Sequence, residues 1–227
     1  MTVTVSDYSW WRTWRPGWAQ AHCVTLVSDI TAKGIISSLH ANTVDSVRGI
    51  DVLHDRTTEG WTAGDDLSSA LIGVTQIDRT WALIAEINGF VGVTERLMGP
   101  MSPGRTIVSH FSNINAVHRF NWWHDGQLLV DFDLLFPAER FGADPAALLG
   151  DLGEVGLRLD ANPDDIARID LSAAGFALAQ RITNVTCTPA LFERSDFLVA
   201  QVAIPDGAEQ QRYEEALRVT WHHPTTW

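Results

Sequence analysis

The chain has 227 residues, 45% hydrophobic and 19% charged, so we expect a globular protein with a real core and not a disordered chain. The formal net charge of −12 disfavours phosphate backbones and anionic lipids, so neither nucleic acid nor a membrane is an expected partner. No apolar run is long enough to span a bilayer, and the start lacks the pattern of a signal peptide. These features together predict a cytoplasmic protein.

The N-terminal segment 1–18 is rich in tryptophan and is predicted to form a helix. Asp7 is a suitable cap for its start, and Pro16 would end it. Trp10 and Trp14 are four residues apart and would share one helical face. We interpret the helix as a clamp held against the core by its large rings, with an aromatic binding surface as the alternative.

Residues 19–204 are expected to form the body of the fold. A strand at "CVTLV" precedes a helix capped by Thr31. The polar segment 43–70 contains several glycines and is predicted to be an irregular insertion. Further strands are predicted at "IGVTQID" and "WALIAEIN", the second of which is apolar enough for a central strand buried on both faces. Residues 205–227 would form a C-terminal extension.

Glu86 conflicts with its apolar surroundings in "WALIAEIN". A carboxylate in a buried strand must be paired, protonated or functional, and Arg119 is the candidate partner. The next motif, "GFVG" at residues 89–92, would form a strand-to-helix turn or hold an anion on free backbone N–H groups. Because no full GxGxxG or GxxxxGK[ST] motif occurs, we expect no nucleotide and assign no cofactor.

The stretch "HRFNWWHDGQLLVDFD", residues 118–133, is predicted to form a β-hairpin, because Asp125-Gly126 suits a type I′ turn. The simplest register pairs His124 with Gln127, Trp122 with Leu129, Phe120 with Asp131 and His118 with Asp133. One face would then carry His118, Phe120, Trp122, Asp131 and Asp133. The opposite face, with Arg119 and Asn121, is more apolar and is expected to meet the core.

The face with His118 has two interpretations. A histidine opposite an aspartate suits general acid–base chemistry, which makes candidate catalytic residues of His118, Asp131, Asp133 and Glu86. The same alternation is typical of the solvated side of an ordinary antiparallel sheet, which we favour. The candidate ligand-binding residues are Asn113, Asn115, Arg119, Phe120 and Trp122, although asparagine is also common in tight turns. Two carboxylates and a histidine also suit a divalent metal, but we assign no metal site.

Helical patterns follow at "DPAALLGDL", "IDLSAAGFALAQRITN" and "TPALFERS", and a late strand at "DFLVAQVAIP". The whole chain, 1–227, therefore predicts one α+β domain with a mixed or mostly antiparallel sheet and helices packed on its faces. Cys23 and Cys187 lie in apolar stretches and are expected to be buried, reduced thiols. His222-His223 near the C-terminus is expected to be incidental.

From "WALIAEINGF" through "RTIVSHFSNINAVHRFNWWHDGQLLVDFDLLFP" to "LAQRITNVTCTPALFE", the chain resembles a family of uncharacterised proteins common in actinobacteria and known only as a domain of unknown function. The shared elements are Trp81, Glu86, Asn88, Gly89, Asn113, Asn115, Arg119, Phe120, Gly126 and residues 178–191. The resemblance covers most of residues 20–200 and leaves out the Trp-rich start and segment 43–70. It identifies a relative without implying an activity.

Two functions are compatible with the sequence. The first is a cytosolic, non-catalytic binding or regulatory protein of unknown partner, because the chain is acidic, rich in aromatic residues and free of GxSxG and HExxH motifs. An immunity-like role against a basic protein is one form of it. The second is a small enzyme acting on a small or peptidic substrate, with His118 as general acid or base and Asp133 orienting it. A deep cavity lined by His118, Asp133, Glu86, Asn113 and Asn115 would favour the enzyme, and a flat hairpin face would favour binding.

Overall fold

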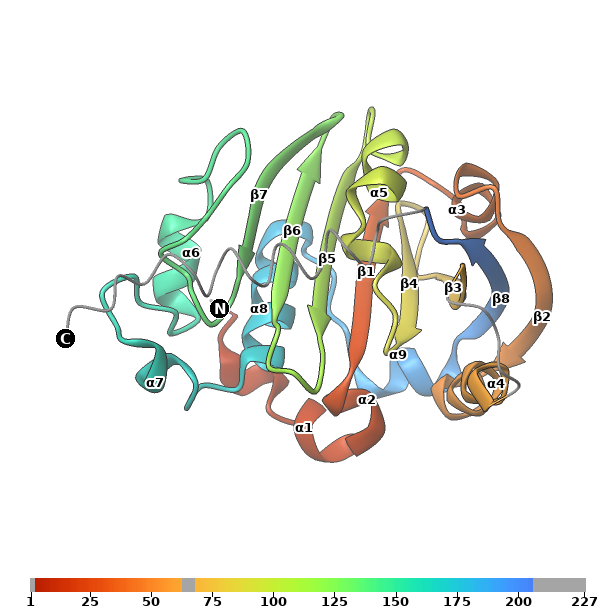
Figure 1. The fold of residues 1–227 in the computed structure, drawn as a ribbon, viewed down its shortest axis with the longest axis horizontal. Helices are drawn as coiled ribbons and strands as arrows, with labels where there is room; N and C mark the ends of the chain where they lie inside the picture. The colour runs from red at the N-terminus through yellow and green to blue at the C-terminus, as the bar shows by residue number, and fades with distance from the viewer. Residues whose placement is uncertain (1–2, 63–67, 206–227) are drawn as a thin grey trace.

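The computed structural model describes residues 3–62 and 68–205, and these contain one antiparallel sheet of eight strands (Figure 1). The strands are β1 (His22–Ser28), β2 (Asn42–Arg48), β3 (Ser69–Gln76), β4 (Trp81–Ile87), β5 (Thr106–Ser112), β6 (Arg119–His124), β7 (Gln127–Asp133) and β8 (Asp196–Ala203). Their order across the sheet is β2-β8-β3-β4-β1-β5-β6-β7. The predicted α+β class is confirmed, with the sheet antiparallel throughout.

Short helices connect the strands and cover the sheet. They are η1 (Val5–Tyr8), α1 (Trp11–Trp14), α2 (Pro16–Gln20), α3 (Ala32–Ser38), α4 (Ile50–Thr62), η2 (Val91–Val93), α5 (Glu95–Met101), α6 (Leu149–Glu154), α7 (Pro163–Ile166), α8 (Leu171–Thr183) and α9 (Pro189–Arg194). Helix α8 packs on β5, and η2 packs on β1 and β5 (Figure 1).

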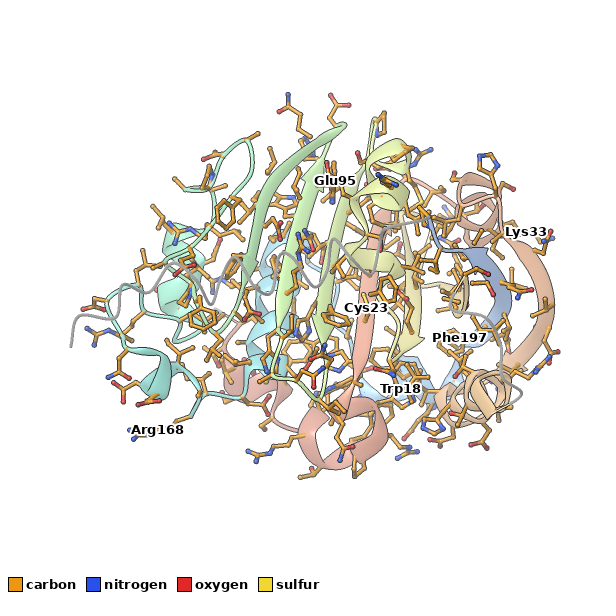
Figure 2. All side chains as sticks on the ribbon, viewed as in Figure 1. Trp18, Cys23, Lys33, Glu95, Arg168 and Phe197 are labelled. Carbon is orange, nitrogen blue, oxygen red and sulfur yellow. The ribbon has the colours of Figure 1, made fainter. Side chains whose placement is uncertain are left out.

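Both faces of the central part of the sheet are buried, because side chains alternate along each strand and both sides carry apolar residues. On one face, Val24, Phe120 and Phe176 belong to a large cluster that also includes the N-terminal helices. On the other face, Val27, Ile84, Trp123 and their neighbours pack beneath α3 and α5. Cys23 lies within the sheet, whereas Lys33 and Arg168 project at the periphery (Figure 2). The two cysteines are free and buried, as predicted.

The N-terminal segment forms three short helices instead of the single predicted one. Asp7 does not begin a long helix but accepts a hydrogen bond from the Thr4 N–H in the first turn of η1. Arg15 is extended between α1 and α2, because a residue that precedes proline avoids the helical region. The interpretation as a clamp is confirmed, since Trp11 and Trp18 are each only 1% exposed.

The prediction of an irregular insertion over residues 43–70 is wrong. Strand β2 pairs with β8 at the edge of the sheet, and α4 follows it directly. The polar composition was misleading because β2 is an edge strand whose residues are almost entirely exposed. In α4, by contrast, the apolar residues Ile50 and Leu53 are fully buried. Residues 63–67 and the C-terminal residues 206–227, with His222-His223, lie outside the described residues.

The hairpin turn is confirmed, but its predicted register is wrong beyond the first two pairs. Asp125 and Gly126 both have positive φ, 45° and 82°, as a type I′ turn requires. After the pairs His124–Gln127 and Trp123–Leu128, a β-bulge shifts the register, and the observed pairs become Trp122–Val130, Asn121–Asp131, Phe120–Phe132 and Arg119–Asp133.

Segment 141–144 explains the bulge, because it lies along the outer edge of β7 and hydrogen-bonds to its backbone. The Ala143 and Asp144 N–H groups donate to the carbonyls of Leu128 and Leu129. The extra residue is Leu129, which pairs with no residue of β6. Its carbonyl oxygen still accepts a hydrogen bond, from the Asp144 N–H.

The shifted register exchanges the predicted faces of the hairpin. Phe120 and Phe132 become neighbours, with ring centroids 5.8 Å apart, and pack into the large cluster. Asp131 and Asp133 are sent to the opposite face, with Arg119 and Asn121. The predicted face of His118, Phe120, Trp122, Asp131 and Asp133 does not form.

Candidate functional site

Glu86 is fully buried near the end of β4, and its carboxylate accepts hydrogen bonds from the Val91 N–H (2.8 Å) and the Gly92 N–H (2.9 Å). The "GFVG" turn therefore does hold an anion on its free N–H groups, but that anion is the protein's own carboxylate. Burial raises the pKa of Glu86 to about 7. The expectation that Glu86 is buried is confirmed, and its hydrogen-bond partners are backbone N–H groups.

Glycine is required in this turn by close approach. A Cβ atom at Gly89 would lie 2.4 Å from Glu86 Oε2, and one at Gly92 would lie 1.9 Å from Thr25 Oγ1. The predicted partner Arg119 is wrong, because its guanidinium donates to Asp131, with Nε 2.8 Å from Oδ1. The Glu86 side chain is thus sealed from solvent. Close packing around it explains why the "GFVG" motif has glycine at residues 89 and 92.

Two buried histidines lie side by side on the sheet face that α8 covers. His22 of β1 and His110 of β5 have ring centroids 5.0 Å apart, and Phe176 of α8 contacts both rings. Gly175 leaves room for them, because a Cβ there would lie 2.5 Å from the His110 ring. Burial lowers the pKa of His22 to about 3 and that of His110 well below its usual range, so both rings are neutral.

These histidines carry polar atoms without partners among the described residues. His22 Nδ1 lies 2.8 Å from the Trp18 carbonyl oxygen, but its Nε2 and both ring nitrogens of His110 are buried and unpaired. The Nε1 of Trp11, whose ring centroid is 4.9 Å from that of His22, is unpaired as well. Such a concentration of unsatisfied buried groups is uncommon in a native protein and marks this region.

His118 lies just before β6, and its Nδ1 is 3.1 Å from Ser112 Oγ. The predicted side-chain pair with Asp133 is wrong, because the bulge places Arg119 opposite Asp133. Asp133 Oδ2 instead accepts from the His118 backbone N–H at 3.0 Å. Burial lowers the pKa of His118, while the charges of Asp133 and Asp170 act in the opposite direction. Burial also raises the pKa of Asp133.

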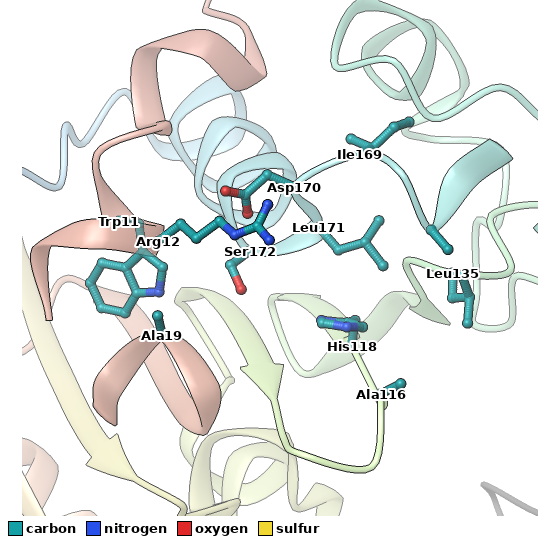
Figure 3. Close-up of a pocket in the computed structure, with 11 residues that line it drawn as sticks. Trp11, Arg12, Ala19, Ala116, His118, Leu135, Ile169, Asp170, Leu171 and Ser172 are labelled. Carbon is teal, nitrogen blue, oxygen red and sulfur yellow. The ribbon is translucent and has the colours of Figure 1, made fainter. Parts of the chain in front are cut away.

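A cavity of about 300 Å³ opens beside His118, between α1, α2 and the start of α8 (Figure 3). Its polar lining consists of Trp11, Arg12, His118, Asp170 and Ser172. Its apolar wall includes Leu135, Ile169 and Leu171. Asp170 caps α8, because its Oδ1 accepts from the Ala173 N–H at 3.0 Å.

Of the predicted site residues, only His118 lines this cavity. Glu86, Phe120 and Trp122 are built into the interior or its margin, and Asp131 is paired with Arg119. Asn113 Oδ1 accepts from the backbone N–H groups of residues 115 and 117, so the "NIN" motif is a turn, and Asn115 is exposed.

The residues that the sequence did not single out are Trp11, His22, His110, Asp170 and Ser172. Two of them had a usable signal, since His22 and His110 are histidines within otherwise apolar strands. Alternation along "RTIVSHFS" places His110 at an inward position once the strand is known to be central.

Within residues 3–62 and 68–205, no group of three or more histidine, cysteine or carboxylate side chains has the spacing to hold a metal ion. Among the same residues, no helix is long and apolar enough to cross a membrane.

Comparisons with known proteins bear on the family alone. Neither the curated proteins nor the solved structures gave a match to this chain. One family model matches residues 1–206, which include the Trp-rich start and segment 43–70 that the sequence resemblance left out. That match does not address the expected actinobacterial distribution, which stays a prediction. The chain belongs to the family of unknown function DUF6461.

Proposed function

We propose that the protein binds a small organic molecule in the cavity between the N-terminal helices and the start of α8. One observation carries the proposal: the cavity combines an apolar wall with converging polar groups from Trp11, Arg12, His118 and Ser172. Its volume of about 300 Å³ is at the lower end of the range for ligand sites, so the ligand is small.

The walls of the cavity are held in place by contacts outside it, which supports a preformed site. Trp11 packs against Phe176 and Phe192, with ring centroids 4.5 and 5.5 Å away. Tyr8 Oη donates to Gln180 Oε1 of α8 at 2.7 Å, which fixes the N-terminal segment to that helix. A site that is rigid before binding loses less entropy when the ligand enters.

We also propose that the protein is cytoplasmic and that neither nucleic acid nor a membrane is its partner. The net charge of −12 supports the exclusion of phosphate backbones and anionic lipids. Cys23 and Cys187 are both unpaired thiols, which suits a reducing compartment.

An enzyme remains a second candidate because of His118. Its Nδ1 lies 3.1 Å from Ser112 Oγ and its ring lines the cavity, so a ligand bound there would lie beside the imidazole. The lowered pKa of His118 favours the neutral imidazole, which is the form that a general base requires. In that case a bound ligand is converted on prolonged incubation, and His118→Gln binds it without converting it, as NMR spectra of the ligand would report.

Binding is tested by ligand-observed NMR with a panel of small amphipathic compounds. Ala19 lines the cavity, so Ala19→Phe should fill it and abolish binding, whereas Ala146→Phe adds the same ring at an exposed site elsewhere. Thermal melting checks that both variants fold. The proposal fails if no compound binds the wild-type protein, or if Ala19→Phe binds as tightly as Ala146→Phe.

A further inference from the structure

The indole of Trp11 provides the first indication of what the ligand is. Trp11 is 1% exposed, and its Nε1–H forms no hydrogen bond with any described residue. Figure 3 shows the ring in the wall of the cavity, with its nitrogen on the edge toward Ala19. An indole N–H can only donate, so the missing partner is an acceptor.

Arg12 provides the second indication. Arg12 is exposed, lines the same cavity and forms no ion pair with another described residue. By contrast, the guanidinium groups of Arg15 and Arg181 bind the carboxylates of Asp51 and Asp151. A planar guanidinium with five N–H donors matches the geometry of a carboxylate.

Charge in the cavity favours a single negative charge over a double one. One guanidinium is present, and the Asp170 carboxylate lies in the same lining, where it repels anions. A phosphate dianion carries two negative charges that Asp170 would repel, and the described lining of the cavity has no second cation to offset that repulsion. A carboxylate carries only one negative charge.

We infer that the ligand is a small organic carboxylate with an apolar body. Its carboxylate accepts hydrogen bonds from Trp11 Nε1 and Arg12, and its body lies against Leu135, Ile169 and Leu171. This inference rests on the proposed function, because it names the class of molecule that the same cavity takes.

The test uses three probes with one aromatic body and different head groups: phenylacetate, neutral 2-phenylethanol and cationic phenethylamine. Calorimetric or NMR titration of the wild-type protein should find phenylacetate tighter than either of the others by at least about tenfold, the value of one charge-assisted contact. Phenylacetate that binds no tighter than 2-phenylethanol overturns the inference, and so does binding of none of the three.

Variants then locate the carboxylate. Trp11→Phe keeps the ring and removes the N–H donor, and Arg12→Gln removes the charge from an exposed position, where folding is not at risk. Each should weaken phenylacetate binding by about tenfold or more. The matched controls Trp18→Phe and Arg79→Gln should bind as the wild type does, because Trp18 has an equally unpaired Nε1 and Arg79 is equally exposed, yet neither lines the cavity.

The ligand site and the carboxylate inference can be refuted separately. If 2-phenylethanol binds and Ala19→Phe abolishes that binding, the cavity is a ligand site, even where phenylacetate shows no preference. Wild-type affinity of both Trp11→Phe and Arg12→Gln for phenylacetate overturns the carboxylate inference while leaving the site itself intact.

Discussion

Single buried residues decide much of the pH behaviour of this protein, and Glu86 is the clearest case. Its two oxygens accept from the N–H groups of Val91 and Gly92. Glu86→Gln leaves one N–H facing an NH₂ group, so at pH 5 the free energy of unfolding should fall by about 1–3 kcal/mol. Denaturant titration measures the loss. Glu95→Gln, at an exposed position, serves as the control and should change little.

The pH dependence of that difference has a definite sign. The pKa of Glu86 is raised from 4.5 to about 7 in the folded state, so its protonated form contributes stability that is complete below pH 4.5 and lost as the pH rises through 7. The gap between wild type and Glu86→Gln should therefore narrow from pH 5 to pH 8. A gap that stays constant over this range would show that the carboxylate is ionised throughout.

His22 acts in the opposite direction. Its pKa is lowered from 6.5 to about 3 by burial, so its neutral form contributes stability that is present above pH 6.5 and lost as the pH falls. Between pH 6.5 and 4 the wild type should lose roughly 3 kcal/mol from this group, and His22→Asn should lose correspondingly less. Unfolding curves at several pH values compare the two proteins, and parallel pH profiles would contradict the assignment.

At the scale of elements, the hairpin depends on its turn. Gly126→Val should destabilise the fold by about 1–3 kcal/mol, because a β-branched residue is strained at a φ of 82°. Gly126→Asn should cost less, since asparagine tolerates this region. Denaturant midpoints rank the three proteins, and equal midpoints for valine and asparagine would mean that backbone strain is not the cause.

The contact between α8 and β5 makes a second prediction at this scale. Gly175→Ala would ordinarily favour a helix, but the added Cβ lies 2.5 Å from the His110 ring, so we expect a loss of about 1–3 kcal/mol. In the His110→Ala background the same change should be neutral or stabilising. A double-mutant cycle measures the coupling between the two positions, and additive effects would refute the proposed contact.

Local patterns predicted some elements well and others badly. The Asp125-Gly126 turn was predictable because backbone conformation alone demands those residues. The bulge was not, because it depends on segment 141–144 hydrogen-bonding to the carbonyls of Leu128 and Leu129. Alternation assumes an unbroken ladder, and one extra residue moves every later side chain to the other face. The candidate pair of His118 and Asp133 was lost for this reason.

For the whole molecule, the class of fold was predictable and the strand order was not. Mixed helical and strand patterns sufficed for α+β, but β2 pairs with β8, which lies at the far end of the chain. The cavity is equally non-local, because α1, the approach to β6 and the start of α8 meet only in the folded protein. Sequence alone therefore identified His118 but not its surroundings.

The central claim is that this cavity is a ligand site, and the His118 ring reports on it directly. In ¹H–¹³C NMR spectra of the histidine rings, titration with phenylacetate or 2-phenylethanol should shift the His118 resonance to saturation. The resonances of His40 and His124, which lie outside the cavity, should stay in place. Ala19→Phe should abolish the shift. A His118 resonance that moves with neither compound, or one that moves equally in Ala19→Phe, would contradict the account.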